Sequence, residues 1–179
     1  RRTAANAEAA WAELRNELVP PRTMVDIVVA DNADYANGYA TPYPTNRIVV
    51  YARPPVEDHA LRNHEDWNRL LVTHELVHIF HLDRVRGIWA LGQRVFGRAA
   101  PLFPNTYAPR WITEGLAVHY ESKLAGGGRL RGTEFPAYVR AAAIEGRLPS
   151  LDEAGHVPQL AMPEVLTEWV HQALGTLLA

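Results

Sequence analysis

The spacing of apolar residues along the chain separates predicted helices from predicted strands. In residues 1–19 they recur at helical spacing until two consecutive prolines end the pattern, so we expect a helix there. Two short β-branched runs bounded by turn residues, 23–30 and 47–52, predict strands. The stretch between them, 31–46, is rich in Asp, Asn, Gly and Pro and predicts turns throughout. The pattern therefore places a small β portion near the front of the chain.

The remainder of the chain is mainly helical in pattern. A helical apolar pattern runs from about 58 to 82, and a second helix is predicted over 110–124, where three glycines stop it. The connection 84–109 predicts one short helix within a long linking segment. Two more helices are expected over 135–146 and 163–178.

Length and composition are those of one globular domain over residues 1–179, with an apolar fraction of 47% and a charged fraction of 21%. A net charge of −2 is not the excess of positive charge that is typical of proteins that bind nucleic acid or an anionic membrane. The absence of cysteine excludes disulfides and thiolate metal sites. No stretch reaches the roughly 18 apolar residues of a membrane span.

The sequence HELVH at 74–78 carries the first candidate chemistry. His74 and His78 lie four residues apart, so a helix turns both imidazoles toward a single ion. Glu75 points beside that face, where it can hold and deprotonate a water molecule. The pattern is short enough to occur in helices that bind no metal, so the motif alone leaves both interpretations open.

A catalytic zinc site usually takes three protein ligands and leaves one position for water. One known extension of the motif requires glycine at position 81 and histidine at position 84, but the chain has His81 and Arg84. The third ligand can instead be a glutamate on a later helix, and Glu114 in WITEGLAVHYE is the candidate. Gly115 beside it would let the two helices pack closely. The alternative is an ordinary solvated glutamate, yet the surrounding run is apolar, which disfavours an unpaired carboxylate.

HELVH followed by WITEGLAVHYE resembles the gluzincin branch of the zinc metallopeptidases, the MA clan. WITEG is similar to a segment of the M1-family aminopeptidases in which asparagine stands at the place of Thr113. The chain departs in two ways: 35 residues separate His78 from Glu114, a longer separation than in those enzymes, and Val118 stands where thermolysin-like enzymes place an aspartate. The closer similarity is to bacterial peptidase-MA-like domains, which read HExxH followed by W-x-x-E-G-L-A.

The resemblance covers about residues 35–125 and implies an α+β zincin-like metallopeptidase domain, with a small N-terminal sheet and then a mainly helical part. It implies Zn²⁺ held by His74, His78 and Glu114. It also implies an edge strand over the active-site helix, with which an extended substrate pairs. Residues 37–52 resemble that element, and a core strand after a loop is the equal alternative.

Other site residues remain open at this stage. Such enzymes usually stabilise the oxyanion with a tyrosine or histidine. Glu121, seven residues after Glu114, shares its helix face and is the candidate to orient His74 in place of the missing aspartate. The candidates for the oxyanion are Tyr107, Tyr120, Tyr138, His119, His156 and His171.

The expected function is zinc-dependent hydrolysis of peptide or protein substrates, with Glu75 as general base. No acidic motif that grips a free amine is present, which favours an endopeptidase. The alternative class is a non-catalytic domain that keeps zinc for stability or binds peptide without cutting it. The similar bacterial domains often head longer exported proteins, and the chain begins with Arg1 rather than Met. We therefore expect a processed piece or fragment of an exported bacterial protein, periplasmic or extracellular, with further domains as partners.

Residues 87–103, in the connection between the two motif helices, are more apolar than expected for a loop that only links two helices. The hypothesis is a wall or lid over the zinc cleft. The competing hypothesis is a contact with a membrane or with missing domains of a longer chain.

Overall fold

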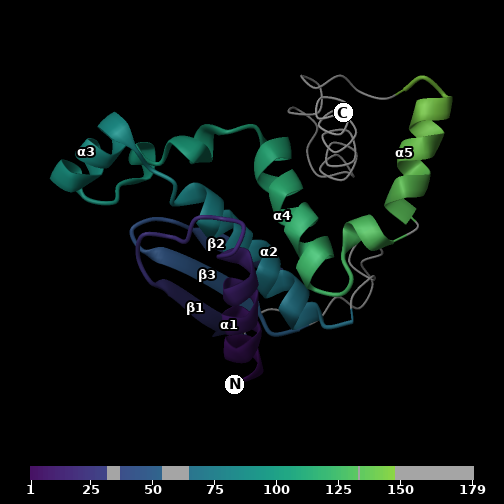
Figure 1. Ribbon diagram of the computed structural model, residues 1–179, viewed down its shortest axis with the longest axis horizontal. Helices are drawn as coiled ribbons and strands as arrows, with labels where there is room; N and C mark the ends of the chain where they lie inside the picture. The colour runs from purple at the N-terminus through teal and green to yellow at the C-terminus, as the bar shows by residue number, and fades with distance from the viewer. Residues whose placement is uncertain (32–36, 54–64, 133, 148–179) are drawn as a thin grey trace.

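The computed structural model describes residues 1–31, 37–53, 65–132 and 134–147, and these form an α+β fold, as the sequence predicts. A three-stranded sheet and five α-helices make up the described part (Figure 1). In chain order these are α1 (Arg2–Leu14), β1 (Val25–Ala30), β2 (Gly38–Thr41), β3 (Asn46–Tyr51), α2 (Trp67–Leu82), α3 (Gly87–Phe96), α4 (Arg110–Leu124) and α5 (Glu134–Ile144). Three 3₁₀ turns accompany them: η2 (Ala100–Leu102), η3 (Pro104–Tyr107) and η4 (Arg129–Arg131).

The sheet has the order β1-β3-β2, with β1 parallel and β2 antiparallel to the central strand β3. The strands predicted at 23–30 and 47–52 are confirmed as β1 and β3, shifted by one or two residues. The prediction of turns throughout 31–46 is wrong at β2. This strand has weak local preference, and its pairing with β3 overrides the turn-forming composition. The stretch 37–52 thus contains both an edge strand and a core strand.

Helix α2 lies at the centre of the molecule, between α1, α4 and the sheet (Figure 1). Every residue from Leu70 to Val77 is buried, and a helix enclosed in this way belongs to the core rather than to the surface. Its first turn is capped by Asp66, whose carboxylate accepts a hydrogen bond from the Arg69 amide at 3.2 Å. The helix therefore begins at Trp67, and the predicted start near 58 falls outside the described residues.

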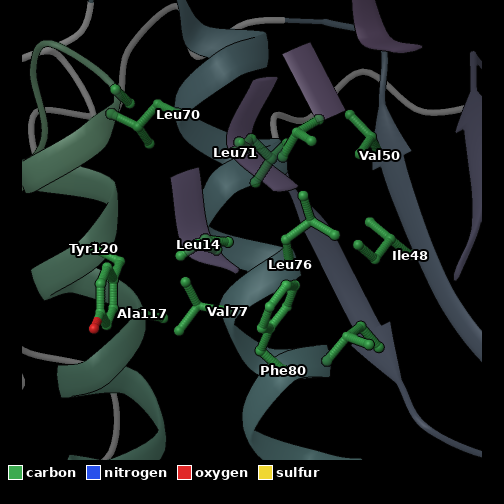
Figure 2. Packing of buried hydrophobic residues seen from close by; sticks show 14 of the residues in the cluster. Leu14, Ile48, Val50, Leu70, Leu71, Leu76, Val77, Phe80, Ala117 and Tyr120 are labelled. Atoms are coloured by element: carbon green, nitrogen blue, oxygen red, sulfur yellow. The ribbon is translucent and has the colours of Figure 1, made fainter. Parts of the chain in front are cut away.

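Figure 2 shows the hydrophobic core that encloses α2. Leu76 and Phe80 lie among side chains of the sheet and of α1, and Val77 faces Ala117 on α4. Trp11 of α1 meets Phe80 edge to face, with ring centroids 4.9 Å apart. The core thus fixes α4 against α2, which sets the position of everything that α4 carries.

The later helix predictions have mixed outcomes. The helix over 110–124 is confirmed as α4, and the helix over 135–146 is confirmed as α5 with an earlier end. The short helix expected in 84–109 is α3. The helix predicted over 163–178 lies outside the described residues. None of the described helices has the length and apolarity that crossing a bilayer requires.

A buried ionic cluster anchors the C-terminal end of α2. The carboxylate of Asp83 is fully buried and meets Arg22 at 2.7 Å and Arg98 at 2.9 Å. The Asn46 amide donates to the same carboxylate at 3.0 Å, and Arg98 also donates to the Pro42 carbonyl. This Asp83 cluster (Asp83, Arg22, Asn46 and Arg98) ties α2 to the start of β3 and to the β2–β3 turn. It therefore holds the edge strand in place beside α2.

Asp83→Asn should lower the free energy of unfolding by on the order of 3 kcal/mol at neutral pH, because two guanidinium groups lose a buried counter-charge. Burial alone would raise the pKa of Asp83, but hydrogen bonds from Asn46 and Arg22 and the charge of Arg98 hold it below its ordinary value of 3.8. The contribution of the ionised Asp83 carboxylate to the free energy of unfolding is therefore complete above about pH 5 and is lost as the pH falls. Urea unfolding at neutral and acidic pH measures both effects.

The matched control is Asp26→Asn, on an exposed position of β1. It should change the free energy of unfolding by less than about 0.5 kcal/mol. Equal stability of the two variants at neutral pH would contradict the role assigned to the Asp83 cluster.

Candidate metal centre

Three potential ligand side chains meet where α2 packs against α4. His74 Nε2 and His78 Nε2 are 3.1 Å apart. Glu114 Oε2 lies 3.5 Å from His74 Nε2 and 3.7 Å from His78 Nε2. Within the described residues, this is the group of His, Cys, Asp and Glu side chains that could hold a metal ion. The structure thus brings together the three residues that the sequence predicts as ligands.

The separations suit one small cation. Bonds of about 2.0–2.2 Å in a tetrahedron place neighbouring ligand atoms about 3.3–3.6 Å apart. Of the three observed separations, 3.5 Å lies within that range, 3.1 Å lies just below it and 3.7 Å lies just above it. The three side chains could therefore close on a shared ion with movements of a few tenths of an ångström.

The electrostatics of Glu114 fit this arrangement. Burial alone would raise the pKa of its carboxyl, but the hydrogen bond to His74 and the neighbouring charges lower it to about 2. Its side chain is about a quarter exposed, at 27%, and it faces the two histidines. The alternative of an ordinary solvated glutamate does not describe this environment.

Glu75 lies beside the three ligand atoms but is not one of them. The residue is buried, and this burial, partly offset by His74, raises the pKa of its carboxyl to about 7. One carboxylate oxygen, Oε2, has no hydrogen-bond partner among the described residues. The other faces the β2 backbone, since a Cβ at Gly38 would lie 3.2 Å from it. A buried carboxylate oxygen with an unmet bond is a place for a water molecule or a substrate group.

The ring nitrogen of His74 that does not face the other ligands contacts a buried ion pair, Glu121 with Arg129. This nitrogen, Nδ1, lies 2.6 Å from Oε2 of Glu121, whose side chain is fully buried. Arg129 donates to both oxygens of that carboxylate, from Nε at 3.0 Å and from Nη2 at 3.1 Å. A proton on Nδ1 leaves the lone pair of Nε2 directed at Glu114 and His78. Glu121 therefore stands where the sequence predicts the residue that orients His74.

Arg129 reaches Glu121 because the chain folds back sharply after α4. Gly128 has φ of 101°, and a Cβ there would lie 2.6 Å from Ser122 Oγ and 2.8 Å from Ser122 Cα. Only glycine fits this close approach. Leu130 then donates its amide to Ser122 Oγ at 3.2 Å. The contact of Arg129 with Glu121 could not be predicted from the sequence, because the three glycines before Arg129 indicate only that a helix ends there.

A cleft of about 610 Å³ opens over these residues. Its walls come from β2, α2, the segment before α4 and the first turns of α4, with Arg129 at one side. The edge strand contributes Tyr39 to the lining, and the segment before α4 contributes Thr106 and Ala108. No sequence motif identifies Tyr39, Thr106 or Ala108 as cleft residues.

None of the oxyanion candidates whose side chains the structure describes lines the cleft. The Tyr120 hydroxyl donates to Glu17 at 3.2 Å, and the ring belongs to the hydrophobic core (Figure 2), so its candidacy is wrong. Tyr107 and His119 are not among the residues that line the cleft. The Tyr138 side chain, like His156 and His171, lies outside what the structure describes.

The hypothesis of a wall or lid formed by 87–103 is also wrong for this structure. None of the cleft-lining residues comes from that segment. Part of its apolar content is used elsewhere, because Phe103 is fully buried and Leu102 packs against Gly92.

Comparisons of the chain with models of protein families, with curated proteins and with solved structures found no match. Inferences about its function therefore rest on the site itself.

Arg129→Ala should lower the free energy of unfolding by on the order of 3 kcal/mol, because Glu121 is left buried without its counter-charge. Arg129→Lys should restore only part of this, since an ammonium cannot donate in parallel to both carboxylate oxygens. Arg131→Ala, in the same 3₁₀ turn at an exposed position, is the control and should change stability by less than about 0.5 kcal/mol. Urea unfolding measures all three. Equal stability of the two alanine variants would show that the Glu121–Arg129 pair is not formed.

Proposed function

We propose that the chain is a zinc-dependent peptidase domain that hydrolyses peptide bonds in the cleft beside α2. The observation that carries the proposal is the triangle of His74, His78 and Glu114 ligand atoms, with Glu75 adjacent to it on the same cleft. The resemblance of HELVH and WITEGLAVHYE to the gluzincins, and to bacterial peptidase-MA-like domains, points to the same chemistry.

The two histidines and Glu114 would hold the zinc ion, because two imidazoles and one carboxylate are a usual ligand set for hydrolytic zinc. The ion would acidify a water molecule and polarise the scissile carbonyl. Glu121 and Arg129 serve this by holding His74 in one orientation, so that its Nε2 stays directed at the ion. Second partners of this kind commonly support metal affinity by about 10- to 100-fold.

Glu75 is the general base of the proposed reaction. The residue lines the cleft, and its buried Oε2 has no hydrogen-bond partner among the described residues, so the carboxylate can accept the proton of an attacking water. The same carboxyl then delivers the proton to the departing amine. Because Glu75 follows His74 directly within the buried stretch Leu70–Val77 of α2, its position is fixed relative to the ligands.

The edge strand β2 is the proposed binding surface for an extended substrate. Within the described part of the chain it pairs with β3 on one side only, and its residues Gly38 to Ala40 line the cleft. An extended peptide can add to such an edge through main-chain hydrogen bonds. Glu75 and Glu114 are the acidic residues among those lining the cleft. In the proposed reaction Glu75 is the general base and Glu114 is a zinc ligand. No further acidic group in the described lining is placed to hold a free amine, which favours internal cleavage over removal of N-terminal residues.

A zinc domain without catalytic activity is the alternative. Structural zinc sites are closed by four protein ligands, whereas three potential ligands meet here beside an open cleft. The two functions differ in their response to substitution of Glu75, because that residue is not a ligand.

Glu114→Ala should lower zinc affinity by at least about 100-fold while leaving the fold intact, because two histidines remain but the ligand set is broken. Competition with a chromophoric chelator measures the affinity, and circular dichroism checks the fold. Glu8→Ala, at an exposed position of α1, is the control and should bind zinc like the parent. Retention of one tightly held zinc per chain by Glu114→Ala would exclude Glu114 as a ligand.

Glu75→Gln should bind zinc like the parent but hydrolyse peptides at least about 10²- to 10⁴-fold more slowly, because an amide cannot accept the proton at neutral pH. The assay uses casein or a mixed peptide library, with activity lost to a chelator and restored by zinc. Glu8→Gln should leave the rate unchanged. A parent that binds zinc but cuts no peptide supports the non-catalytic alternative. A parent and Glu75→Gln variant of equal rate would place the catalytic base elsewhere.

A further inference from the structure

Helix α3 is packed with its polar side inward. Its one buried residue is Gln93, which donates to the Leu102 carbonyl at 2.9 Å and accepts a hydrogen bond from Arg22 at 2.8 Å. The opposite side is apolar and open to solvent. Its exposed fractions are 77% for Ile88, 61% for Leu91, 66% for Val95 and 76% for Phe96. These four residues, spaced three, four and one apart, form the α3 face.

The face is a larger exposed apolar surface than folding of this helix requires. A surface helix normally buries its apolar stripe and exposes its polar side, and α3 does the reverse. Trp89 at the edge of the face is also partly exposed, at 40%. Contiguous exposed apolar surface of this kind marks a contact with a partner or a membrane.

The charges around the face distinguish between these occupants. Residues 84–113 contain five arginines and no aspartate or glutamate. Arg98 pairs with Asp83 and Arg110 lines the cleft, which leaves Arg84, Arg86 and Arg94 near α3. Arg86 and Arg94 are exposed at the start of α3 and along its side. Apolar side chains flanked by arginines, with a tryptophan at the border, match the chemistry of an anionic lipid surface.

We propose that α3 docks on an anionic membrane surface, with the α3 face entering the headgroup region and the arginines meeting lipid phosphates. A helix of ten residues is too short to span a bilayer, so it would lie in the plane of the interface. Figure 1 shows α3 projecting from the rest of the described molecule, at the end opposite α5. The proposal does not depend on the metal centre.

The test measures sedimentation of the full chain with vesicles of phosphatidylcholine alone or mixed with phosphatidylglycerol. The parent should bind the mixed vesicles, and added salt should weaken the binding. The double variant Leu91→Ser, Val95→Ser should bind at least about tenfold less tightly, because two apolar side chains no longer enter the interface. Arg86→Ser with Arg94→Ser should lose a similar factor on mixed vesicles only.

Matched controls come from other exposed apolar positions. Met24→Ser and Ile144→Ser alter side chains that are at least as exposed and should leave vesicle binding unchanged. All substituted positions are exposed, so thermal unfolding should match the parent. Because the chain has no cysteine, Leu91→Cys carries a single fluorophore. Its emission should shift to the blue on mixed vesicles, whereas the same label at Met24→Cys should not respond.

Three results would overturn the proposal. The first is a parent that does not bind mixed vesicles. The second is binding that is equal on both vesicle types and unaffected by the arginine substitutions. The third is self-association in sedimentation velocity that the Leu91, Val95 double variant abolishes while vesicle binding stays unchanged, which would make a second copy of the chain the occupant of the face.

Discussion

Helix α2 is enclosed by α1, α4 and the sheet, so each polar side chain in its buried segment must find a partner inside the protein. Thr73 donates to the Arg69 carbonyl at 2.8 Å, and His74 meets Glu121 at 2.6 Å. Within the stretch Leu70–Val77, Glu75 Oε2 is the exception, since it has no partner among the described residues. A core helix made only for packing would carry an apolar residue there. The chemistry of the cleft thus follows from polar groups placed in a helix that has almost no exposed side.

Two buried carboxylates with arginine partners stabilise the surroundings of that helix. Glu121 with Arg129 fixes the orientation of the His74 ring, and Asp83 with Arg22 and Arg98 fixes the sheet against the helix end. Pairs of this kind add little net stability compared with apolar residues of similar size, but they are strongly destabilising when one partner is removed. Their effect is therefore mainly geometric. They set the distance between the edge strand and the ligand triangle, which a peptide in the cleft would have to match.

The parts that could be predicted from the sequence are those set by neighbours along the chain. His74 and His78 share a face because helical spacing is local, and Glu114 was identifiable because an apolar run surrounds its carboxylate. The local pattern of residues 38–41 predicts turns, because β2 exists through pairing with β3. An edge strand in 37–52 was indicated only by the resemblance to the gluzincins. Arg129 was equally hidden, since its contact with Glu121 depends on a left-handed glycine packed on α4. The environment of Tyr120 was also inaccessible, because a helix residue one position from Glu121 can point into the core or into the cleft, and packing alone decides.

The outward direction of the α3 face is a consequence of the Asp83 cluster. Arg22 bonds to Asp83 and Gln93 at once, so turning α3 over would bury its apolar side but would break the Arg22–Gln93 bond and leave the Leu102 carbonyl without its donor. The polar side of the helix is thereby held inward. His74 lies nine residues before Asp83, which is about 13.5 Å along the axis of a helix that rises 1.5 Å per residue. The same helix α2 therefore carries the proposed zinc ligands and, at its end, the anchor of the proposed lipid-binding helix.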